Sequence, residues 1–155
     1  MIEREACITL IEQTYFGNVR NGNIDATMAC FTPDAHVLIR HGDNPERRFG
    51  VEPGAGETSL RDFYAHLCGN YTAWFGAFQH YIDGDEDRAA SRFTVRLSPK
   101  PNGLYADAGK QELLNCNFFE FRDGLISHMI IYYSNPAAGA AKDQKPGAPT
   151  GYPPG

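Results

Sequence analysis

The sequence predicts an α+β fold in which helices pack against one face of an antiparallel sheet. Two observations carry this prediction: apolar residues recur at helical spacing in the first half of the chain, and four strand-like runs follow one another in the second half. The chain has 155 residues, of which 42% are hydrophobic, and this is enough for one domain with a substantial core.

The first predicted helix carries its apolar residues along one stripe. They are Ile8, Leu10, Ile11, Tyr15 and Val19. The helix should end at Asn21-Gly22, because glycine readily adopts the left-handed conformation found after helix C-termini. Asn23 can then cap a short second helix, which Pro33 should end. The apolar face of this second helix would consist of Ile24, Met28 and Phe31.

A strand and a third helix are predicted next. Residues 36–40 have the composition of a strand, and the loop that follows contains a candidate short edge strand at 48–51. Ser59, with the acidic Asp62 three residues later, is typical of a helix N-terminus. The apolar residues behind this cap recur at helical spacing: Leu60, Phe63, Tyr64, Leu67 and Tyr71.

The second half of the chain should form a meander of long strands. The four strand-like runs cover 73–83, 88–98, 111–122 and 125–134. Turn residues at Asp83-Gly84-Asp85 and Arg122-Asp123-Gly124 indicate antiparallel hairpins. The domain should therefore span residues 1–135. The segment 136–155 is rich in Pro, Gly and Ala and has no periodic apolar face, so we expect that removing residues 140–155 leaves the thermal stability nearly unchanged.

The last two predicted strands have two apolar faces. Because strand side chains alternate, Asn115, Asn117 and Phe119 share one face, and in the final strand they are joined by Met129. The opposite face of the final strand carries His128, Ile130 and Tyr132. One layer of helices covers only one face, so a second subunit should cover the other, which predicts a homodimer.

The two asparagines among these apolar neighbours admit two interpretations. A buried amide without a partner costs about 1–3 kcal/mol, so Asn115 and Asn117 should either bond to backbone or water, or point into a cavity and hold a polar atom of a ligand. We favour the second interpretation.

Composition argues against several classes of function. A net charge of −5 disfavours nucleic-acid binding, and no apolar run approaches the roughly 18 residues of a membrane span. The N-terminus has no apolar signal segment, which predicts a cytoplasmic location. The four cysteines lack the short spacings of zinc or redox motifs and should be free thiols. No His/Asp/Glu set has the spacing of metal ligands, so we expect neither a metal nor another cofactor.

Several motifs together resemble the nuclear transport factor 2-like superfamily. They are Asn-Gly-Asn-Ile-Asp (21–25), Ala-Cys-Phe-Thr-Pro-Asp-Ala (29–35), Leu-Arg-Asp-Phe-Tyr-Ala (60–65) and Phe-Arg-Asp-Gly (121–124). Within it the chain is most similar to ketosteroid isomerases, SnoaL-like polyketide cyclases and scytalone dehydratase. The resemblance implies a strongly curved sheet wrapped around three helices, forming a cone with a central pocket (a cystatin-like roll).

The resemblance to the isomerases implies roles for four residues. Tyr15 would donate a hydrogen bond to the oxyanion of the substrate, and Tyr64 would hydrogen-bond to Tyr15. Asn117 stands where the isomerases have a protonated carboxylic acid, and an amide also donates. Ile39 stands at the position of the general base and cannot take a proton, which argues against steroid-type isomerisation.

The resemblance to scytalone dehydratase implies an alternative acid–base residue. Gln79-His80-Tyr81-Ile82 is similar to the motif that carries its catalytic histidine, and Asn115 and Asn117 would be its polar pair. The second catalytic histidine is missing near Pro99-Lys100, and Val19-Arg20 replaces a tyrosine–aspartate pair.

The residues themselves leave the acid–base role open. His80 is either a proton shuttle or a core histidine, and His41, near the expected pocket mouth, is a reserve base. Tyr15 is likewise either an oxyanion donor or a core aromatic.

Two functions follow as hypotheses. The first is a cofactor-independent isomerase, dehydratase or cyclase for a small apolar carbonyl or phenolic molecule, with Tyr15, His80 and Asn117 as catalytic residues. The remaining predicted pocket wall consists of Ile39, Tyr64, Trp74, Phe78, Asn115, Phe119 and Met129. The second is a non-catalytic small-molecule-binding or dimeric scaffold protein of the same fold.

Overall fold

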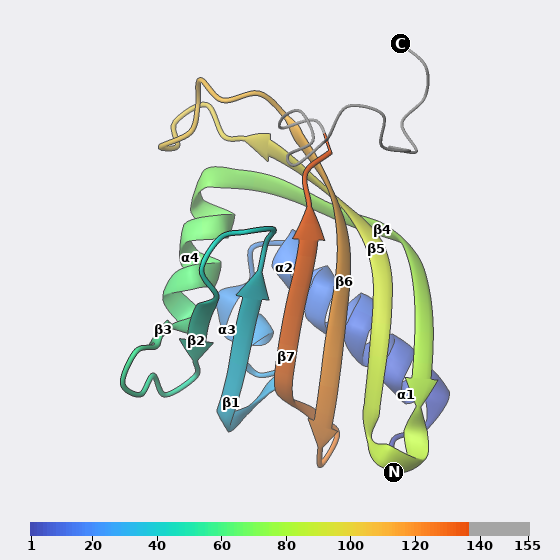
Figure 1. Ribbon diagram of the computed structural model, residues 1–155. Coiled ribbons are helices and arrows are strands. Elements are labelled where there is room, and N and C mark those ends of the chain that lie inside the picture. The colour runs from blue at the N-terminus through green and yellow to red at the C-terminus, as the bar shows by residue number, and fades with distance from the viewer. Residues whose placement is uncertain (137–155) are drawn as a thin grey trace, which may run out of the picture.

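The computed structural model describes residues 1–136, and it has the predicted α+β architecture (Figure 1). The helical elements are α1 (Arg4–Thr9), the π-helical turn η1 (Leu10–Tyr15), α2 (Phe16–Arg20), α3 (Ile24–Met28), α4 (Leu60–Asn70) and the 3-10 turn η2 (Gly84–Glu86). The strands are β1 (Phe31–Arg40), β2 (Arg47–Gly50), β3 (Thr58–Ser59), β4 (Tyr71–Asp83), β5 (Arg88–Pro99), β6 (Gln111–Arg122) and β7 (Leu125–Ser134). The predicted C-terminal tail lies, after its first residue, outside the described residues.

The strands form one seven-stranded sheet in the order β3-β2-β1-β7-β6-β5-β4. Strands β4 to β7 form the predicted antiparallel meander. The sheet is mixed where the sequence predicted an antiparallel one, because β1 pairs in parallel with β7 and β2 in parallel with β3. Strands β1 and β7 are far apart in the sequence, so the long connection between them leaves their relative direction unconstrained by a hairpin.

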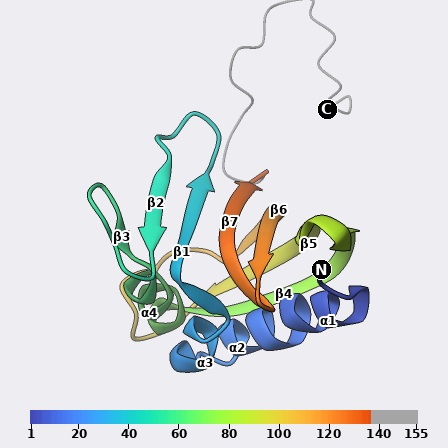
Figure 2. The same cartoon turned by 90° about the horizontal axis from the view of Figure 1, so that it is seen from below.

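The helices cover one face of the curved sheet (Figure 2). The elements α1, η1 and α2 follow one another directly and contribute a buried stripe that includes Ile11, Tyr15 and Val19. Both predicted N-caps are confirmed: the Asn23 side chain accepts from the Ala26 N–H, and the Ser59 hydroxyl accepts from an N–H in the first turn of α4. The two caps therefore place α3 and α4 where the sequence predicted them.

The region around Pro33 differs from the prediction. The second helix ends at Met28, and Phe31 and Pro33 belong to β1 instead. The pairing of β1 with β7 shifts register between Phe31 and His36, so Pro33 lies in an irregular segment of the strand. Such a segment tolerates proline, because proline has no N–H to contribute to a regular ladder.

Alternation of side chains in β6 and β7 is confirmed. Asn117, Phe119 and Met129 are buried on the helix-facing side, whereas Phe118 and Tyr132 are exposed on the other. The four cysteines are free, as predicted.

In β4 the predicted alternation fails at Trp74. A bulge shifts the register between Gly76 and Gln79, and Ala77 within it has a positive φ of 55°. A bulge adds one residue to a strand, so residues on either side of it exchange faces. Trp74 therefore lies on the outer face, under the guanidinium of Arg96 at 4.5 Å, and does not belong to the pocket wall.

Candidate functional site

A cavity of about 180 Å³ lies between the helices and the inner face of the sheet. Most of its wall is apolar. Its lining residues are Tyr15, Phe16, Val19, Ile39, Arg47, Phe63, Tyr64, Leu67, Phe75, Phe93, Val95, Leu97, Leu113, Asn115, Asn117, Ile131 and Tyr133. An apolar wall with a few polar groups is typical of small-molecule sites, although this cavity is smaller than the roughly 300–1,000 Å³ of sites for drug-sized ligands.

Tyr15 and Tyr64 form a buried pair in the cavity wall. Their hydroxyl oxygens are 2.5 Å apart, and the two side chains are only 3% and 2% exposed. Burial raises the pKa of each phenol well above its ordinary value, so both are protonated at neutral pH. One hydroxyl donates to the other, which leaves the second O–H proton available to a ligand. Tyr15 is the last residue of η1, and π-helical turns are frequent at functional sites.

The two asparagines have unpaired amide oxygens. Asn117 is 1% exposed, and its Nδ2 donates only to the sulfur of Met129, at 3.6 Å. Neither its Oδ1 nor the Oδ1 of Asn115 has a hydrogen-bond partner among the described residues. Leaving a buried acceptor unpaired costs about 1–3 kcal/mol. The cavity thus presents two amide oxygens that a ligand with hydroxyl groups would satisfy.

His80 is not among the residues that line the cavity. Its Nδ1 lies 2.7 Å from the Ser91 hydroxyl, and its Nε2 lies 2.5 Å from a carboxylate oxygen of Glu12. The side chain is 7% exposed. Both ring nitrogens are therefore engaged in joining the first helix to β4 and β5. The structure brings Tyr15 and Asn117 to one cavity but leaves His80 outside it.

The other predicted wall residues divide into two groups. Ile39 lines the cavity, together with Tyr64 and Asn115. Phe119 and Met129 are fully buried but are not among the lining residues, and Phe78 packs between the rings of Phe16, Phe93 and His80. In β4 it is Phe75, before the bulge, that reaches the cavity in place of the residues predicted there.

Sequence reasoning missed Arg47, which lines both the cavity and a second hollow at its mouth. This outer hollow, of about 360 Å³, is formed by Ile39, His41, Asn44, Pro45, Glu46, Arg47 and Tyr133. His41 stacks on Tyr133 with 4.1 Å between ring centroids. The pairing of β1 with β2, which places Arg47 opposite Ile39, determines this position, and no local motif indicates it.

Two further features bear on ligands and location. Among residues 1–136, no group of three or more His, Cys, Asp or Glu side chains is arranged to hold a metal ion. No helix in the same range is long and apolar enough to cross a membrane.

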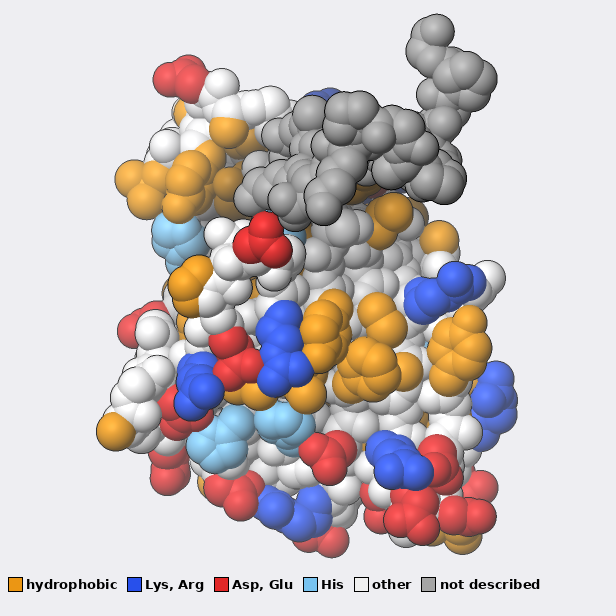
Figure 3. All heavy atoms as spheres, viewed as in Figure 1, with side chains coloured by type: hydrophobic (Ala, Val, Ile, Leu, Met, Phe, Trp, Pro, Cys, Tyr) orange, Lys and Arg blue, Asp and Glu red, His pale blue; other side chains and the backbone are white. Residues whose placement is uncertain are grey.

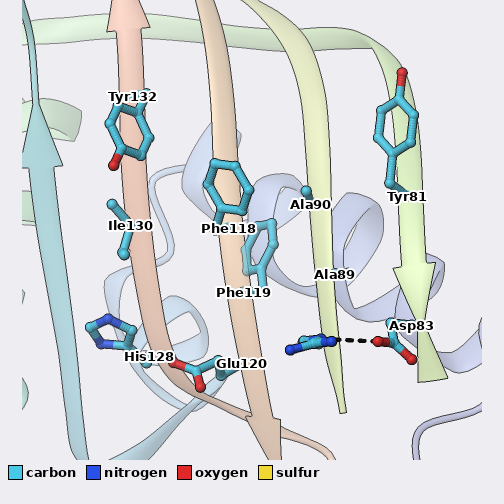
Figure 4. Close-up of a pocket in the computed structure, with 11 residues that line it drawn as sticks. Tyr81, Asp83, Ala89, Ala90, Phe118, Phe119, Glu120, His128, Ile130 and Tyr132 are labelled. Carbon is cyan, nitrogen blue, oxygen red and sulfur yellow. Dashed lines mark hydrogen bonds and ion pairs between the residues drawn. The ribbon is translucent and has the colours of Figure 1, made fainter. Parts of the chain in front are cut away.

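The outer face of the sheet carries a broad apolar surface. Hydrophobic side chains gather over β4 to β7 and are bordered by charged groups and histidines (Figure 3). A shallow pocket of about 490 Å³ lies here, with Phe118, Ile130 and Tyr132 above His128 and Glu120 (Figure 4). Large exposed apolar patches are more frequent at interaction sites than elsewhere on protein surfaces.

The chain belongs to the SnoaL-like family, whose domain model matches residues 13–129. Comparison with curated proteins finds no significant match. Among solved structures, the chain is similar to a putative isomerase from Bacillus subtilis, with a TM-score of 0.66, 15% identity and coverage of 86% of this chain and 89% of that chain. It is also similar to a putative polyketide cyclase from Silicibacter sp. TM1040, with a TM-score of 0.63, 24% identity and coverage of 86% and 92%. A protein from Methylobium petroleophilum described as having a cystatin-like fold matches with a TM-score of 0.65, 19% identity and coverage of 92% and 83%.

Proposed function

We propose that the protein binds a small apolar carbonyl or phenolic molecule in the cone cavity and catalyses a cofactor-independent isomerisation, dehydration or cyclisation that passes through an enol. The observation that carries this proposal is the meeting of the buried Tyr15–Tyr64 pair and the unpaired Asn117 oxygen at one apolar cavity. The similar solved structures described as an isomerase and a polyketide cyclase agree with it.

The polar groups would favour an enol over the corresponding ketone. In either form, the ligand oxygen can accept a hydrogen bond from the tyrosine O–H that is not donated within the pair. Only an enol or phenol can also donate to the Asn117 Oδ1, because a ketone has no O–H. The enol would therefore satisfy one more buried group, an advantage of about 1–3 kcal/mol in an apolar cavity.

The proton transfer needs a base, and the cavity wall contains neither a carboxylate nor an imidazole among the described residues. We assign the role of the base to His41 at the mouth, since it stacks on Tyr133 at the boundary of the cavity. His80 would then hold the first helix against the sheet and take no part in the proton transfer.

The same absence of a base in the wall supports a second candidate function. Ile39 stands in the wall at the position expected for the general base and cannot take a proton. The protein would then bind the same class of molecule without transforming it. A non-catalytic binding protein needs the tyrosine pair and the asparagines but not His41.

Hydrogen exchange of a small ketone separates the two functions. We expect the protein to accelerate deuterium incorporation next to the carbonyl of 2-tetralone in D₂O, measured by NMR. Tyr15→Phe and His41→Gln should each slow the exchange at least tenfold, while Tyr81→Phe, on the exposed outer face, should leave it unchanged. Binding of 2-tetralone without any acceleration would support the non-catalytic function instead.

We also propose that two copies of the chain pair through the outer face of the sheet. Five large exposed hydrophobic residues lie on the outer face: Trp74, Tyr81, Leu114, Phe118 and Tyr132. Packing this face against a second copy would bury these five side chains, which the helices on the opposite face of the sheet do not cover. Sedimentation velocity at micromolar concentration should show a dimer, and Phe118→Glu should convert it to a monomer. Leu104→Glu, in the loop before β6, is the control and should remain dimeric. A monomeric wild-type protein would refute the pairing.

A further inference from the structure

Arg47 at the cavity mouth has no ionic partner among the described residues. Its neighbours Arg40 and Arg48 both pair with Glu46, at 2.6 and 2.9 Å. These two contacts occupy both carboxylate oxygens of Glu46 and lower its pKa. The Arg47 guanidinium forms no ion pair within residues 1–136 and lies instead over two aromatic rings, 5.3 Å from the centroid of Phe49 and 5.7 Å from that of Phe63.

The strand β2 determines which arginine faces the cavity. Side chains alternate along a strand, so Arg47 and Phe49 share the inner face and Arg48 points to the opposite side. Arg47 lines both the cavity and the outer hollow, and Phe63, which also lines the cavity, supports its guanidinium. The aromatic rings hold the cation in place, which reduces the entropy it loses when it binds an anion.

Arg47 and Asn117 stand on the same row across the sheet. Asn117 pairs with Ile131, Ile131 with Ile39, and Ile39 with Arg47. Three strand spacings separate the two ends of this row, or about 14 Å between backbones. Side chains from both ends extend inward over a wall that is apolar between them. The remaining gap suits a molecule of about one ring with a short side chain.

We propose that the ligand of this cavity is a hydroxylated apolar carboxylic acid, whose carboxylate pairs with Arg47 at the mouth while its hydroxyl group reaches Asn117 and the tyrosine pair. The proposal rests on the proposed function, because it assigns a substrate class to the same cavity. A carboxylate is the anion that fits best, since the planar guanidinium matches its two oxygens. The pairing would also set the direction in which the molecule enters the cone.

The selectivity for an acid can be tested with a matched pair of probes. We would measure by calorimetry the binding of trans-4-hydroxycinnamate and of its methyl ester, which keeps the phenol and removes the charge. Wild-type protein should bind the acid roughly tenfold more tightly than the ester. Arg47→Gln should abolish this difference without weakening the binding of the ester. Arg48→Gln is the control, because it removes the same charge one residue away and should retain the preference.

Three outcomes would overturn the proposal. They are equal affinities of acid and ester for the wild-type protein, an equal loss of preference in both arginine variants, and no binding of either probe at millimolar concentration. Tyr15→Phe separates this failure from a failure of the proposed function. If acid and ester bind equally but both lose affinity in Tyr15→Phe, the cavity binds phenols and only the role of Arg47 is refuted. If Tyr15→Phe changes neither affinity, the proposed function fails as well.

Discussion

The buried pair of tyrosines provides a stability test whose size follows from the structure. Tyr15→Phe removes the hydroxyl that Tyr64 contacts at 2.5 Å and leaves the Tyr64 hydroxyl buried without that partner, and Tyr64→Phe does the reverse. Each single change should lower the free energy of unfolding by about 1–3 kcal/mol. The double variant removes both hydroxyls and keeps the edge-to-face contact of the rings, whose centroids are 6.1 Å apart. Its loss should be well below the sum of the two single losses, with a coupling of about 1–3 kcal/mol.

Urea unfolding followed by far-ultraviolet circular dichroism would measure the four free energies. Fluorescence of Trp74, the one tryptophan of the chain, is less suitable, because this side chain lies on the outer face and is 37% exposed. Leu104→Ala is the control: this side chain lies in the loop before β6, away from the outer face, and is 78% exposed, so the substitution should change stability by less than about 0.5 kcal/mol. Additive losses from Tyr15→Phe and Tyr64→Phe would show that the two hydroxyls do not depend on each other.

Two further predictions concern residues outside the cavity. The N–H of Gly54 and the imidazole of His36 lower the pKa of Glu57 below its usual 4.5. The stability that this carboxylate contributes is therefore present above about pH 4.5, and it is lost as the pH falls through the lower pKa of the folded state. Glu57→Gln should therefore flatten the acid limb of a plot of urea midpoint against pH, and an unchanged limb would contradict this. His80→Ala should destabilise the protein by about 1–3 kcal/mol, because it breaks the link to Glu12 and leaves the buried hydroxyl of Ser91 without this partner. A loss of ketone exchange with unchanged stability would instead favour the catalytic role that the sequence predicted for His80.

Local chemistry allowed most of the fold to be predicted from the sequence. The cap at Ser59 and the alternation around Asn117 depend on residues close in the chain, and both are confirmed. The errors arise where distant segments decide the outcome. The bulge at Ala77 reverses the face of Trp74. Gly76, just before it, is a residue typical of bulges, but a single glycine in a strand does not by itself determine where the register shifts. The parallel pairing of β1 with β7 likewise joins segments that are far apart in the sequence, and no local pattern indicates it.

The candidate site shows the same division. The pairing of Tyr15 with Tyr64 follows from a resemblance that spans most of the domain, and the hydroxyl contact is confirmed. The engagement of His80 by Glu12 joins residues 68 positions apart, and the position of Arg47 at the mouth depends on the register of β2. Neither has a sequence motif, so only the folded chain reveals them.

Joint binding of one ligand oxygen by Tyr15 and Asn117 can be measured by a calorimetric titration with 4-chlorophenol. Tyr15→Phe and Asn117→Leu should each weaken binding by about 1–3 kcal/mol, and the double variant by less than the sum. The wild-type protein should also prefer 4-chlorophenol to 4-chloroanisole, because the ether has no proton to donate to the Asn117 oxygen. Equal affinities of all four proteins for the phenol would contradict the claim and leave the two side chains as parts of the core.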